Sequence, residues 1–318
     1  MPVTIKLFQY NCHLFEGTVV CFEGKQCLDG VTRIAAITRT VTNEFNTHSL
    51  VTLCEVWADT VKTDIQKAWQ QVHKEKNNTW FDPDKAVFYK IGSGLLFLST
   101  AEIISHEFEQ FKNLIGGDSM SQKGFYTLKL RLSGYSGDVY LIQTHTQAQL
   151  DGNEFAPSQV AVQKNLDQIV NKVKKLPKDS PFIITGDLNI EEVKQPYSQD
   201  ELSDSYKLMK QKFSALGLQD AFRQYNPVIK DHPGFTYDWQ LPGDVPPGKD
   251  NPLIKRFAPV DITNKLEQRL DYAWVSDHFS ISKAEACYNN KYMYTSPEYG
   301  TGTPLSDHYP LLVEVTLK

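Results

Sequence analysis

The chain has 318 residues, of which 41% are hydrophobic and 22% are charged, and its formal net charge is −5 at pH 7. This composition is typical of a soluble globular protein with a sizeable core, and no run reaches the roughly 20 apolar residues of a membrane-spanning helix. The acidic balance disfavours duplex DNA as the main partner, because phosphate binding usually requires a surplus of Lys and Arg.

Two features of the chain bear on its compartment. The N-terminal stretch MPVTIKLFQYN has no basic region followed by an apolar segment, so no signal peptide is visible, and a secreted or a cytosolic location stays open. None of the five cysteines has the spacing of a zinc site. Cys21 and Cys27 are close enough in sequence to form a disulfide in an oxidising compartment, although free buried cysteines pack well as small apolar residues.

Short apolar runs alternate with stretches of helical periodicity along the chain. In chain order, we expect a strand over residues 3–11, a helix over 29–45, a strand over 49–56, a helix over 59–75 with Asp59 as its N-cap, strands over 93–100, 125–132 and 138–146, a helix over 157–176 that begins with Pro157, a strand over 181–189, a helix over 202–217 that ends at Gly217, and strands over 269–276, 279–287 and 310–317.

This order of elements mixes βα units with strands that follow one another directly. It predicts an α/β fold in which two packed sheets are covered by helices, rather than one parallel doubly wound sheet. We expect a single domain over residues 1–318, because strands continue to the end of the chain. Residues 231–260 are rich in Pro and Gly and are predicted to form a long functional loop.

Polar side chains stand at the ends of the predicted strands, where active sites of layered α/β proteins gather. Each alone has an ordinary explanation, since Asp and Asn form turns and a histidine is often a satisfied core residue. The whole set is unusual, because it brings carboxamides, carboxylates and imidazoles to the strand ends: Asn11, Glu55, His145, Asp187, Asn189, Asp271, Asp307 and His308.

The chemistry of this set favours a hard cation. Many oxygens and few imidazoles suit Mg²⁺, with Mn²⁺ or Co²⁺ as alternatives, better than zinc. We expect Glu55 and Asn11 to hold the cation, where it would neutralise charge on a transferred phosphoryl group.

The remaining strand-end residues suggest a hydrolytic mechanism for a phosphodiester. His308 is expected to act as the base that takes a proton from the attacking water, with Asp271 fixing its other ring nitrogen. Asp187 and Asn189 are two residues apart, so in an extended segment they share a face and can hold one water or phosphoryl oxygen. His145 is expected to donate a hydrogen bond to the phosphoryl or leaving oxygen.

Six motifs resemble, in this order, those of the endonuclease/exonuclease/phosphatase superfamily with the DNase I-like fold: QYN, CEVW, THTQA, GDLN, LDYAWV and SDHYP. The resemblance is greatest to the neutral sphingomyelinases and bacterial sphingomyelinase C, through EVWAD, GSGLLFLS, KGF and PGFTYDW. This resemblance implies a four-layer α-β-β-α sandwich of two packed mixed sheets. It also implies that Asp307 is a further metal ligand and that the protein hydrolyses sphingomyelin to ceramide and phosphocholine. One departure is Cys54, where the family often has Gln.

A sphingomyelinase must reach a lipid headgroup at a membrane surface. Residues 287–302 are rich in tyrosine and resemble the aromatic hairpin with which secreted bacterial members touch bilayers, and tyrosine suits that interface. The alternative is that these tyrosines only pack within a hairpin. The candidate membrane contacts are Tyr288, Tyr292, Met293 and Tyr294, with Trp80 and Phe81 as a second contact.

Two other functions stay open at this stage. One is a DNase I-like nuclease, or another phosphodiesterase or phosphatase of the same fold, and the other is a catalytically inactive fold used as a binding module. The acidic charge and the tyrosine-rich segment argue against the nuclease. We expect a monomer without a nucleic-acid partner, and the headgroup and the number of metal ions are left open.

Overall fold

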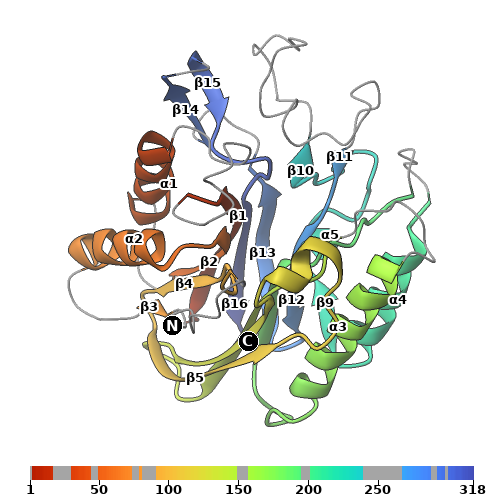
Figure 1. Ribbon diagram of the computed structural model, residues 1–318. Coiled ribbons are helices and arrows are strands. Elements are labelled where there is room, and N and C mark those ends of the chain that lie inside the picture. The colour runs from red at the N-terminus through yellow and green to blue at the C-terminus, as the bar shows by residue number, and fades with distance from the viewer. Residues whose placement is uncertain are drawn as a thin grey trace.

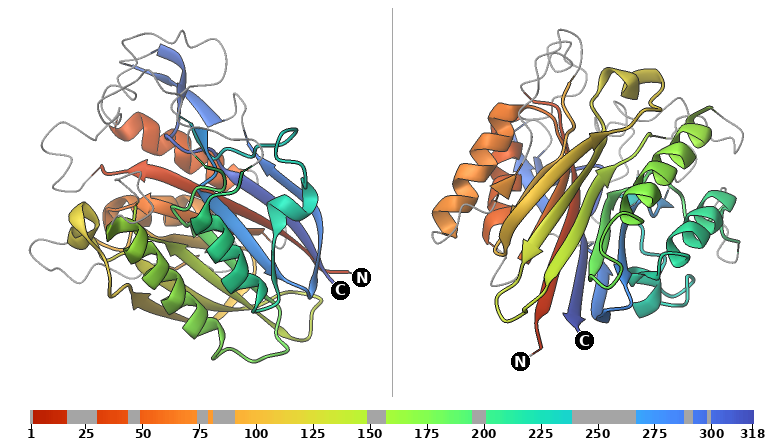
Figure 2. Two further views of the ribbon diagram at one scale, coloured as in Figure 1. Left: turned by 90° about the vertical axis from the view of Figure 1, so that its right-hand side faces the viewer. Right: turned by 90° about the horizontal axis from the view of Figure 1, so that it is seen from below.

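A computed structural model of the chain describes residues 2–16, 30–43, 49–73, 79–80, 91–148, 157–194, 201–238, 267–287, 292–297 and 300–318. These residues form two six-stranded mixed sheets that pack face to face, with helices on both outer faces (Figures 1 and 2). The predicted α/β sandwich with four layers, α-β-β-α, is confirmed.

The first sheet has the strand order β13-β16-β1-β2-β4-β3. Its only parallel pair among these strands is β1–β2, and the other pairs are antiparallel. The strands are β1 (Thr4–Leu14), β2 (Ser49–Val56), β3 (Thr79–Trp80), β4 (Leu96–Ser99), β13 (Phe279–Ala286) and β16 (Leu311–Leu317).

The second sheet has the order β5-β6-β7-β8-β12-β9, in which β7–β8 is the parallel pair. Its strands are β5 (Glu102–Gln110), β6 (Gly124–Arg131), β7 (Asp138–His145), β8 (Phe182–Asp187), β9 (Leu218–Asp220) and β12 (Asp271–Ser276). Two short pairs stand apart from the sheets, β10 (Tyr237–Asp238) with β11 (Glu267–Gln268), and β14 (Met293–Ser296) with β15 (Gly300–Pro304).

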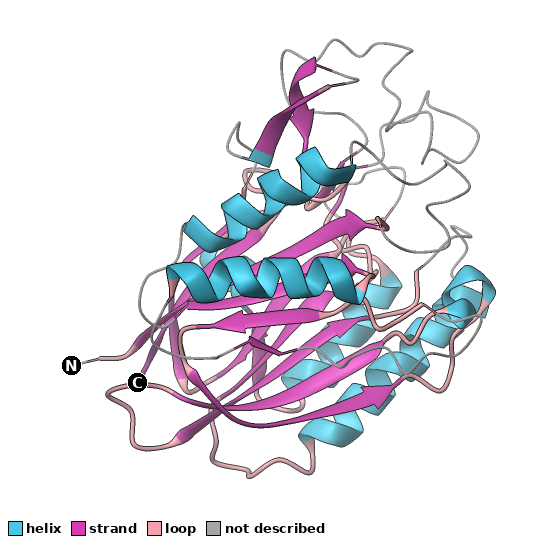
Figure 3. Ribbon diagram, turned by 60° about the vertical axis from the view of Figure 1, so that its left-hand side comes forward, coloured by secondary structure: helices cyan, strands magenta, loops and turns pink. Residues whose placement is uncertain are grey.

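The helices divide between the two outer faces. The first sheet is covered by α1 (Gly30–Asn43) and α2 (Asp59–Val72), and the second by α3 (Pro157–Val173) and α4 (Asp204–Ser214) (Figure 1). The chain also forms two short helical segments, η2 (Gly116–Met120) and α5 (Ala221–Tyr225). Figure 3 shows α1 and α2 across one face, with the β14–β15 hairpin beyond the end of α1, which it contacts.

The alternation of side chains along β1 explains the layers. Ile5 and Leu7 point into the core between the two sheets, whereas Phe8 and Tyr10 point into the core under α1 and α2. From Leu7 to Leu14 every residue of β1 is buried, the polar Gln9, Asn11 and His13 included, so both faces of this strand are covered. A third core lies under α3 and α4. Burial on both faces thus holds β1 rigidly in the middle of its sheet.

Most predicted elements are present, and two differences have clear causes. The edge strand β5, EIISHEFEQ, was not predicted, because its charged and exposed residues hide the apolar alternation of a strand. The N-cap of α2 is Ala58 without a side-chain hydrogen bond, so the prediction of Asp59 as N-cap was wrong. Asp59 is the first helical residue and accepts a hydrogen bond from Lys62 Nζ at 3.3 Å. Gly217 follows α4 with φ 76°, as a helix-terminating glycine should.

Some predicted features lie outside the described residues, namely Cys21, Cys27 and most of the loop over residues 231–260. The other three cysteines, Cys12, Cys54 and Cys287, are buried and free. Within the described part of the chain, no helix is long and apolar enough to cross a membrane.

Candidate active site

Strand pairing places three of the predicted residues in one row across the second sheet. His145 at the end of β7 is in register with Asp187 at the end of β8, and Asp187 is in register with Asp271 at the start of β12. Neighbours in register point to the same face of a sheet. The row therefore faces the first sheet, where β1 and β2 carry Asn11 and Glu55 near their own ends.

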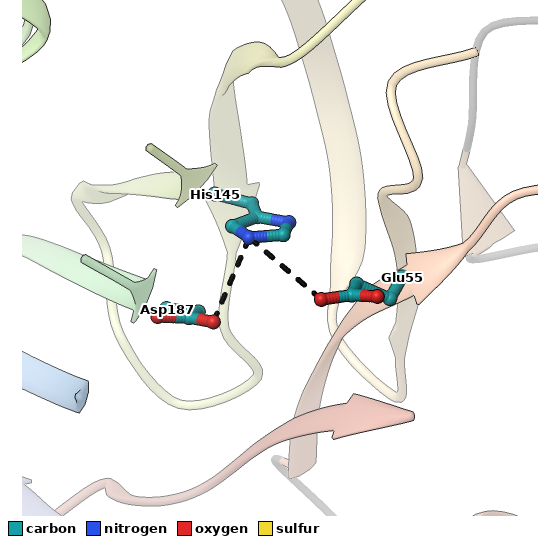
Figure 4. A group of neighbouring side chains, drawn as sticks. All are labelled: Glu55, His145 and Asp187. Atoms are coloured by element: carbon teal, nitrogen blue, oxygen red, sulfur yellow. Dashed lines mark ion pairs between the residues drawn. The ribbon is translucent and has the colours of Figure 1, made fainter. Parts of the chain in front are cut away.

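Asn11 connects the two sheets through its side-chain amide. Its Nδ2 donates to Glu55 Oε1 and to Asp187 Oδ2, both at 2.9 Å. His145 Nε2 lies 3.6 Å from Asp187 Oδ2 and 4.0 Å from Glu55 Oε1, so the imidazole points at both carboxylates (Figure 4). The structure thus brings together four predicted residues from four strands.

His308 and Asp271 form a close pair. His308 Nδ1 lies 2.8 Å from Asp271 Oδ2, and His308 Nε2 lies 3.8 Å from Asp187 Oδ2. Burial alone disfavours the imidazolium, but the charge of Asp271 and its hydrogen bond outweigh this and raise the pKa of His308 to about 10. The carboxylates of Asp187 and Asp307 contribute to the increase, so a cation bound to them would counteract it.

Asp271 is itself held from two further sides. Gln9 Nε2 donates to Asp271 Oδ1 at 3.1 Å, and the backbone N–H of Asp271 donates to Thr236 Oγ1 at 3.0 Å. Thr52 Oγ1 in turn donates to Gln9 Oε1 at 2.6 Å. Both oxygens of the Asp271 carboxylate are therefore fixed, and the one that faces His308 cannot rotate away without breaking the contact with Gln9.

Asp187 and His145, both buried, also have displaced pKa values. Burial, followed by the charge of Asp271, raises the pKa of Asp187 to about 7. Burial lowers the pKa of His145 well below its usual value, and the positive charges of Lys123 and His308 add to this. The neutral form of His145 is thus favoured, and its Nδ1 is buried without a hydrogen-bond partner among the described residues.

The loop after β8 is fixed around the carboxylate of Asp187. The backbone N–H of Asn189 donates to Asp187 Oδ1 at 2.9 Å, and Asn189 Nδ2 donates to the carbonyl of Thr146 at 3.2 Å. Asn189 has φ 48°, and positive φ also occurs at His13 (47°) and Glu55 (56°), the other non-glycine residues of this kind in the described chain. Strained backbone at three positions of one cluster is typical of a functional site.

His13 is a residue of the cluster that the sequence analysis did not single out. Its Nδ1 lies 3.6 Å from Glu55 Oε2 and 3.6 Å from Asp307 Oδ2. Burial raises the pKa of the Asp307 carboxyl, but the charges of His13 and His308 outweigh burial and lower it. The signal was present in the sequence, because His13 is two residues after Asn11 and strand residues at that spacing share a face.

Lys123 and Asp118 also were not predicted as site residues. Lys123 Nζ lies 2.9 Å from Asp118 Oδ1 and donates to the carbonyl of Thr146 at 3.2 Å. The backbone N–H of Ala148 donates to Asp118 Oδ2 at 2.6 Å. This ion pair between a buried lysine and a partly exposed aspartate therefore holds the turn that follows His145, the same turn that Asn189 contacts.

The side chains of the cluster fit a divalent cation. Glu55, Asp187 and Asp307 bring three carboxylates into a largely buried space, and Asn11 adds a carboxamide. Buried negative charge of this density requires a positive partner. Oxygen donors of this kind match the preferences of Mg²⁺ and Mn²⁺, with the imidazole of His145 as an additional donor beside Glu55 and Asp187.

The structure does not support two of the predicted membrane contacts. Tyr292 and Tyr294 are only 5% and 8% exposed, because they pack in the core under α1, where Tyr292 lies 6.1 Å from Phe8 and 6.4 Å from Tyr10 between ring centroids. Met293 between them is partly exposed. The predicted hairpin is present as β14–β15.

Trp80 lies far from that hairpin. It belongs to β3 at the edge of the first sheet, near the end of the molecule where both termini lie, whereas the hairpin is at the opposite end (Figure 1). Its ring stacks on His106 with 3.3 Å between centroids. Trp80 and the hairpin therefore do not form one contact surface. Tyr288 and Phe81 lie outside the described residues.

Solved structures with the same fold include a beta toxin from Staphylococcus aureus with bound magnesium ions (TM-score 0.68, 18% identity, 98% of this chain and 99% of that chain covered). A sphingomyelinase C from Streptomyces griseocarneus has a TM-score of 0.69 at 18% identity and covers 99% of this chain and 100% of its own. An endonuclease/exonuclease/phosphatase family protein from Bacteroides thetaiotaomicron has a TM-score of 0.61 at 14% identity, with 100% and 99% covered.

No curated protein matches this sequence at a significant level. The model of the endonuclease/exonuclease/phosphatase family, by contrast, matches residues 9–308, a span that includes every residue of the cluster from Asn11 to His308. The chain therefore belongs to the endonuclease/exonuclease/phosphatase family, a family of metal-dependent hydrolases of the phosphodiesterase type.

Proposed function

We propose that this protein is a Mg²⁺-dependent phosphodiesterase that hydrolyses sphingomyelin to ceramide and phosphocholine. Hydrolysis is supported above all by the His308–Asp271 pair, in which the second ring nitrogen of His308, Nε2, faces the buried carboxylate of Asp187 at 3.8 Å. A base next to an anionic cation-binding cluster is the arrangement that phosphodiester hydrolysis requires.

The cation would be held by Glu55, Asn11 and Asp307. When bound, it supplies positive charge that stabilises the developing charge on the phosphoryl oxygens. Asn11 also keeps Glu55 and Asp187 at a fixed separation, because one amide group donates to both carboxylates.

His308 would act as the base in its neutral form, which the charge of a cation near Asp187 and Asp307 would favour. Nε2 would then accept a proton from the attacking water, while Asp271 holds the proton on Nδ1 and keeps the ring in place. The water oxygen forms a bond to phosphorus as the bond between phosphorus and the ceramide oxygen breaks in line with it, and the departing oxygen takes up a proton from solvent so that ceramide leaves as the alcohol. His145 would donate a hydrogen bond from Nε2 to the phosphoryl or departing oxygen, and Asp187 and Asn189 would orient the water or the phosphoryl group.

The choice of sphingomyelin rests on three observations. The protein shares its fold over almost its full length with a sphingomyelinase C, although at 18% identity. The sequence motifs shared with the sphingomyelinases include THTQA and KGF, and the charge of Lys123 from the second motif acts on the pKa of His145 from the first. The net charge of −5 does not favour a polyanionic nucleic acid. A nuclease or another phosphodiesterase of the same fold is the alternative.

The proposal is tested by measuring phosphocholine release from sphingomyelin liposomes with Mg²⁺ and with EDTA. We expect release that depends on Mg²⁺ and falls to background with EDTA, because the carboxylate cluster needs the cation. Phosphatidylcholine liposomes and a supercoiled plasmid serve as parallel substrates. Nicking of the plasmid without hydrolysis of sphingomyelin would overturn the proposed substrate and favour the nuclease.

Replacing Gln9 with methionine is expected to lower kcat by about 10- to 100-fold with little change in KM, as is typical when a partner of a functional side chain is lost. Met has a similar length but no N–H to hold Asp271 Oδ1. The ¹H resonance of the His308 Nδ1 proton, measured in the metal-free protein, should shift as well. Cys54→Ala is the control, because it removes the weaker 3.4 Å contact of Gln9 Nε2 with sulfur, together with the contact of that thiol with the Thr144 carbonyl, but leaves the Gln9–Asp271 hydrogen bond. An unchanged kcat and resonance would show that Thr236 alone positions Asp271.

A further inference from the structure

We infer that Gln143 is a positioning residue, which sets the separation of Glu55 and His145 by clamping strand β7 to the end of strand β2. The inference rests on the proposed function, because Glu55 and His145 act there, one at the cation and the other at the phosphoryl group. It concerns the layer of side chains beneath the catalytic ones. The sequence motifs at the strand ends do not include Gln143.

Gln143 interrupts a row of apolar side chains between the two sheets. Alternate residues of β7 point to one face, and Val139 and Leu141 on that face belong to the core between the sheets. Gln143 comes next on this face, directly before His145, and it is fully buried. A buried amide costs free energy unless its polar atoms are hydrogen-bonded, so an apolar side chain would be the ordinary choice. The position therefore needs a reason other than packing.

The side-chain amide of Gln143 reaches across to the first sheet. Its Nε2 donates to the carbonyl oxygens of Leu53 at 2.8 Å and of Leu96 at 3.1 Å. Carbonyl oxygens only accept hydrogen bonds, so these two partners determine the orientation of the amide. Its Oε1 is buried without a hydrogen-bond partner among the described residues. The position thus keeps an amide at a cost in free energy, which indicates that the two donated hydrogen bonds matter.

The two carbonyls lie where the pairing of β2 with β4 is interrupted. Leu53 and Leu96 form the last pair of this ladder. The two segments meet again where the N–H of Val56 donates to the carbonyl of Gly94 at 2.9 Å. Two residues of β2 lie between these contacts but only one of the facing segment, which is the arrangement of a β-bulge. Glu55 is in this bulge with φ 56°, so the amide from the second sheet supplies hydrogen bonds where the first sheet loses its own.

The clamp lies directly beneath the catalytic side chains on both strands. Gln143 is two residues before His145, and its partner Leu53 is two residues before Glu55. His145 Nε2 lies 4.0 Å from Glu55 Oε1, and the two side chains point at each other (Figure 4). Residues two apart in a strand share a face, so a shift of β2 against β7 at the clamp would move Glu55 against His145.

The same geometry has another explanation, in which Gln143 only adds stability to the packing of the sheets. The end of β2 would then be held by its pairing with β1 and by the contact of Cys54 Sγ with the carbonyl of Thr144 at 3.5 Å. The two explanations predict different results. A positioning residue affects the site more than the stability of the fold, whereas a packing residue affects the stability first.

The test compares Gln143→Met with the wild-type protein, both at full length. Met has a similar length but no N–H, so both hydrogen bonds to the first sheet are lost while the volume is nearly kept. Leu141→Val is the matched control, because Leu141 lies on the same face of β7, farther from the site, and belongs to the apolar core. Urea unfolding measures the stability of each protein.

Three properties are measured for each protein: amide hydrogen exchange of Val56 without metal, calorimetric binding of Mg²⁺ alone, and kcat and KM on sphingomyelin liposomes. In Gln143→Met, exchange of the Val56 N–H should be about tenfold faster, because two hydrogen bonds that resist local opening are lost. Mg²⁺ affinity and kcat should each fall by about tenfold, as for a lost partner of a functional side chain. KM should change little, and Leu141→Val should lower only the urea midpoint.

Val56 exchange at the wild-type rate in Gln143→Met would overturn the inference. So would faster exchange with unchanged Mg²⁺ affinity and kcat, or losses that Leu141→Val shares. A wild-type protein that binds no Mg²⁺ would instead overturn the proposed metal-dependent function, and one that binds Mg²⁺ but releases no phosphocholine would overturn the proposed substrate. Because exchange is measured without metal or substrate, it decides the role of Gln143 in either case, and the failures are distinguishable.

Discussion

His308→Ala is expected to lower kcat for phosphodiester hydrolysis by about 10²- to 10⁴-fold, the usual contribution of a general base. The remaining side chains have no equivalent, since the structure favours neutral His145 with its Nε2 directed at two carboxylates rather than held by a partner like Asp271. KM should change little, because the proton is transferred only in the transition state. The measurement is the initial rate with saturating Mg²⁺ across a substrate series.

Asp271→Asn is the matched variant for this prediction. An amide keeps the shape of the side chain but removes the charge that raises the pKa of His308. We expect kcat to fall for this variant too, and the double variant to be no worse than His308→Ala alone, because the two residues act as one unit. Additive losses in the double variant, or a His308→Ala enzyme with normal kcat, would contradict the assigned base.

Gly186→Ala is expected to destabilise the fold by about 4 kcal/mol or more, among the largest effects of a single substitution. Gly186 has φ 148°, and a Cβ atom at this position would lie 1.8 Å from the carbonyl oxygen of Thr144, on the neighbouring strand. Backbone at that distance cannot move aside without separating β7 from β8, the strands that carry His145 and Asp187. Urea unfolding followed by circular dichroism measures the change.

Gly117→Ala is the control for this prediction. No atom lies within 4 Å of a Cβ built at Gly117, so the substitution should change the free energy of unfolding by less than about 1 kcal/mol. A Gly186→Ala protein with the unfolding midpoint of the wild type would contradict this prediction. It would mean that β7 and β8 can separate near the Thr144–Gly186 pair at little cost in free energy.

The sequence predicted a large part of this site because strand ends are visible in it. The runs YLIQTH and FIITGDLN show where buried strands stop, and parallel strands bring their ends to one edge of a sheet. The pairing of His308 with Asp271, proposed from the need of a base for a carboxylate partner, is present at 2.8 Å. His13 was missed although its spacing from Asn11 places it on the same face, because the strand was predicted to end at Asn11 and β1 runs on to Leu14.

Amino-acid sequence by itself determined the elements, the two-sheet architecture and the set of polar residues at the strand ends, because these follow from local periodicity and from where apolar runs stop. Only the tertiary structure decided which of those residues meet. Register placed Asp187 between His145 and Asp271, and the pairing of β1 with β2 brought both Asn11 and His13 to Glu55. Packing under α1 buried Tyr292 and Tyr294, which composition alone left free to face a membrane. Such distances depend on how the strands align and pack, and local sequence patterns do not contain that information.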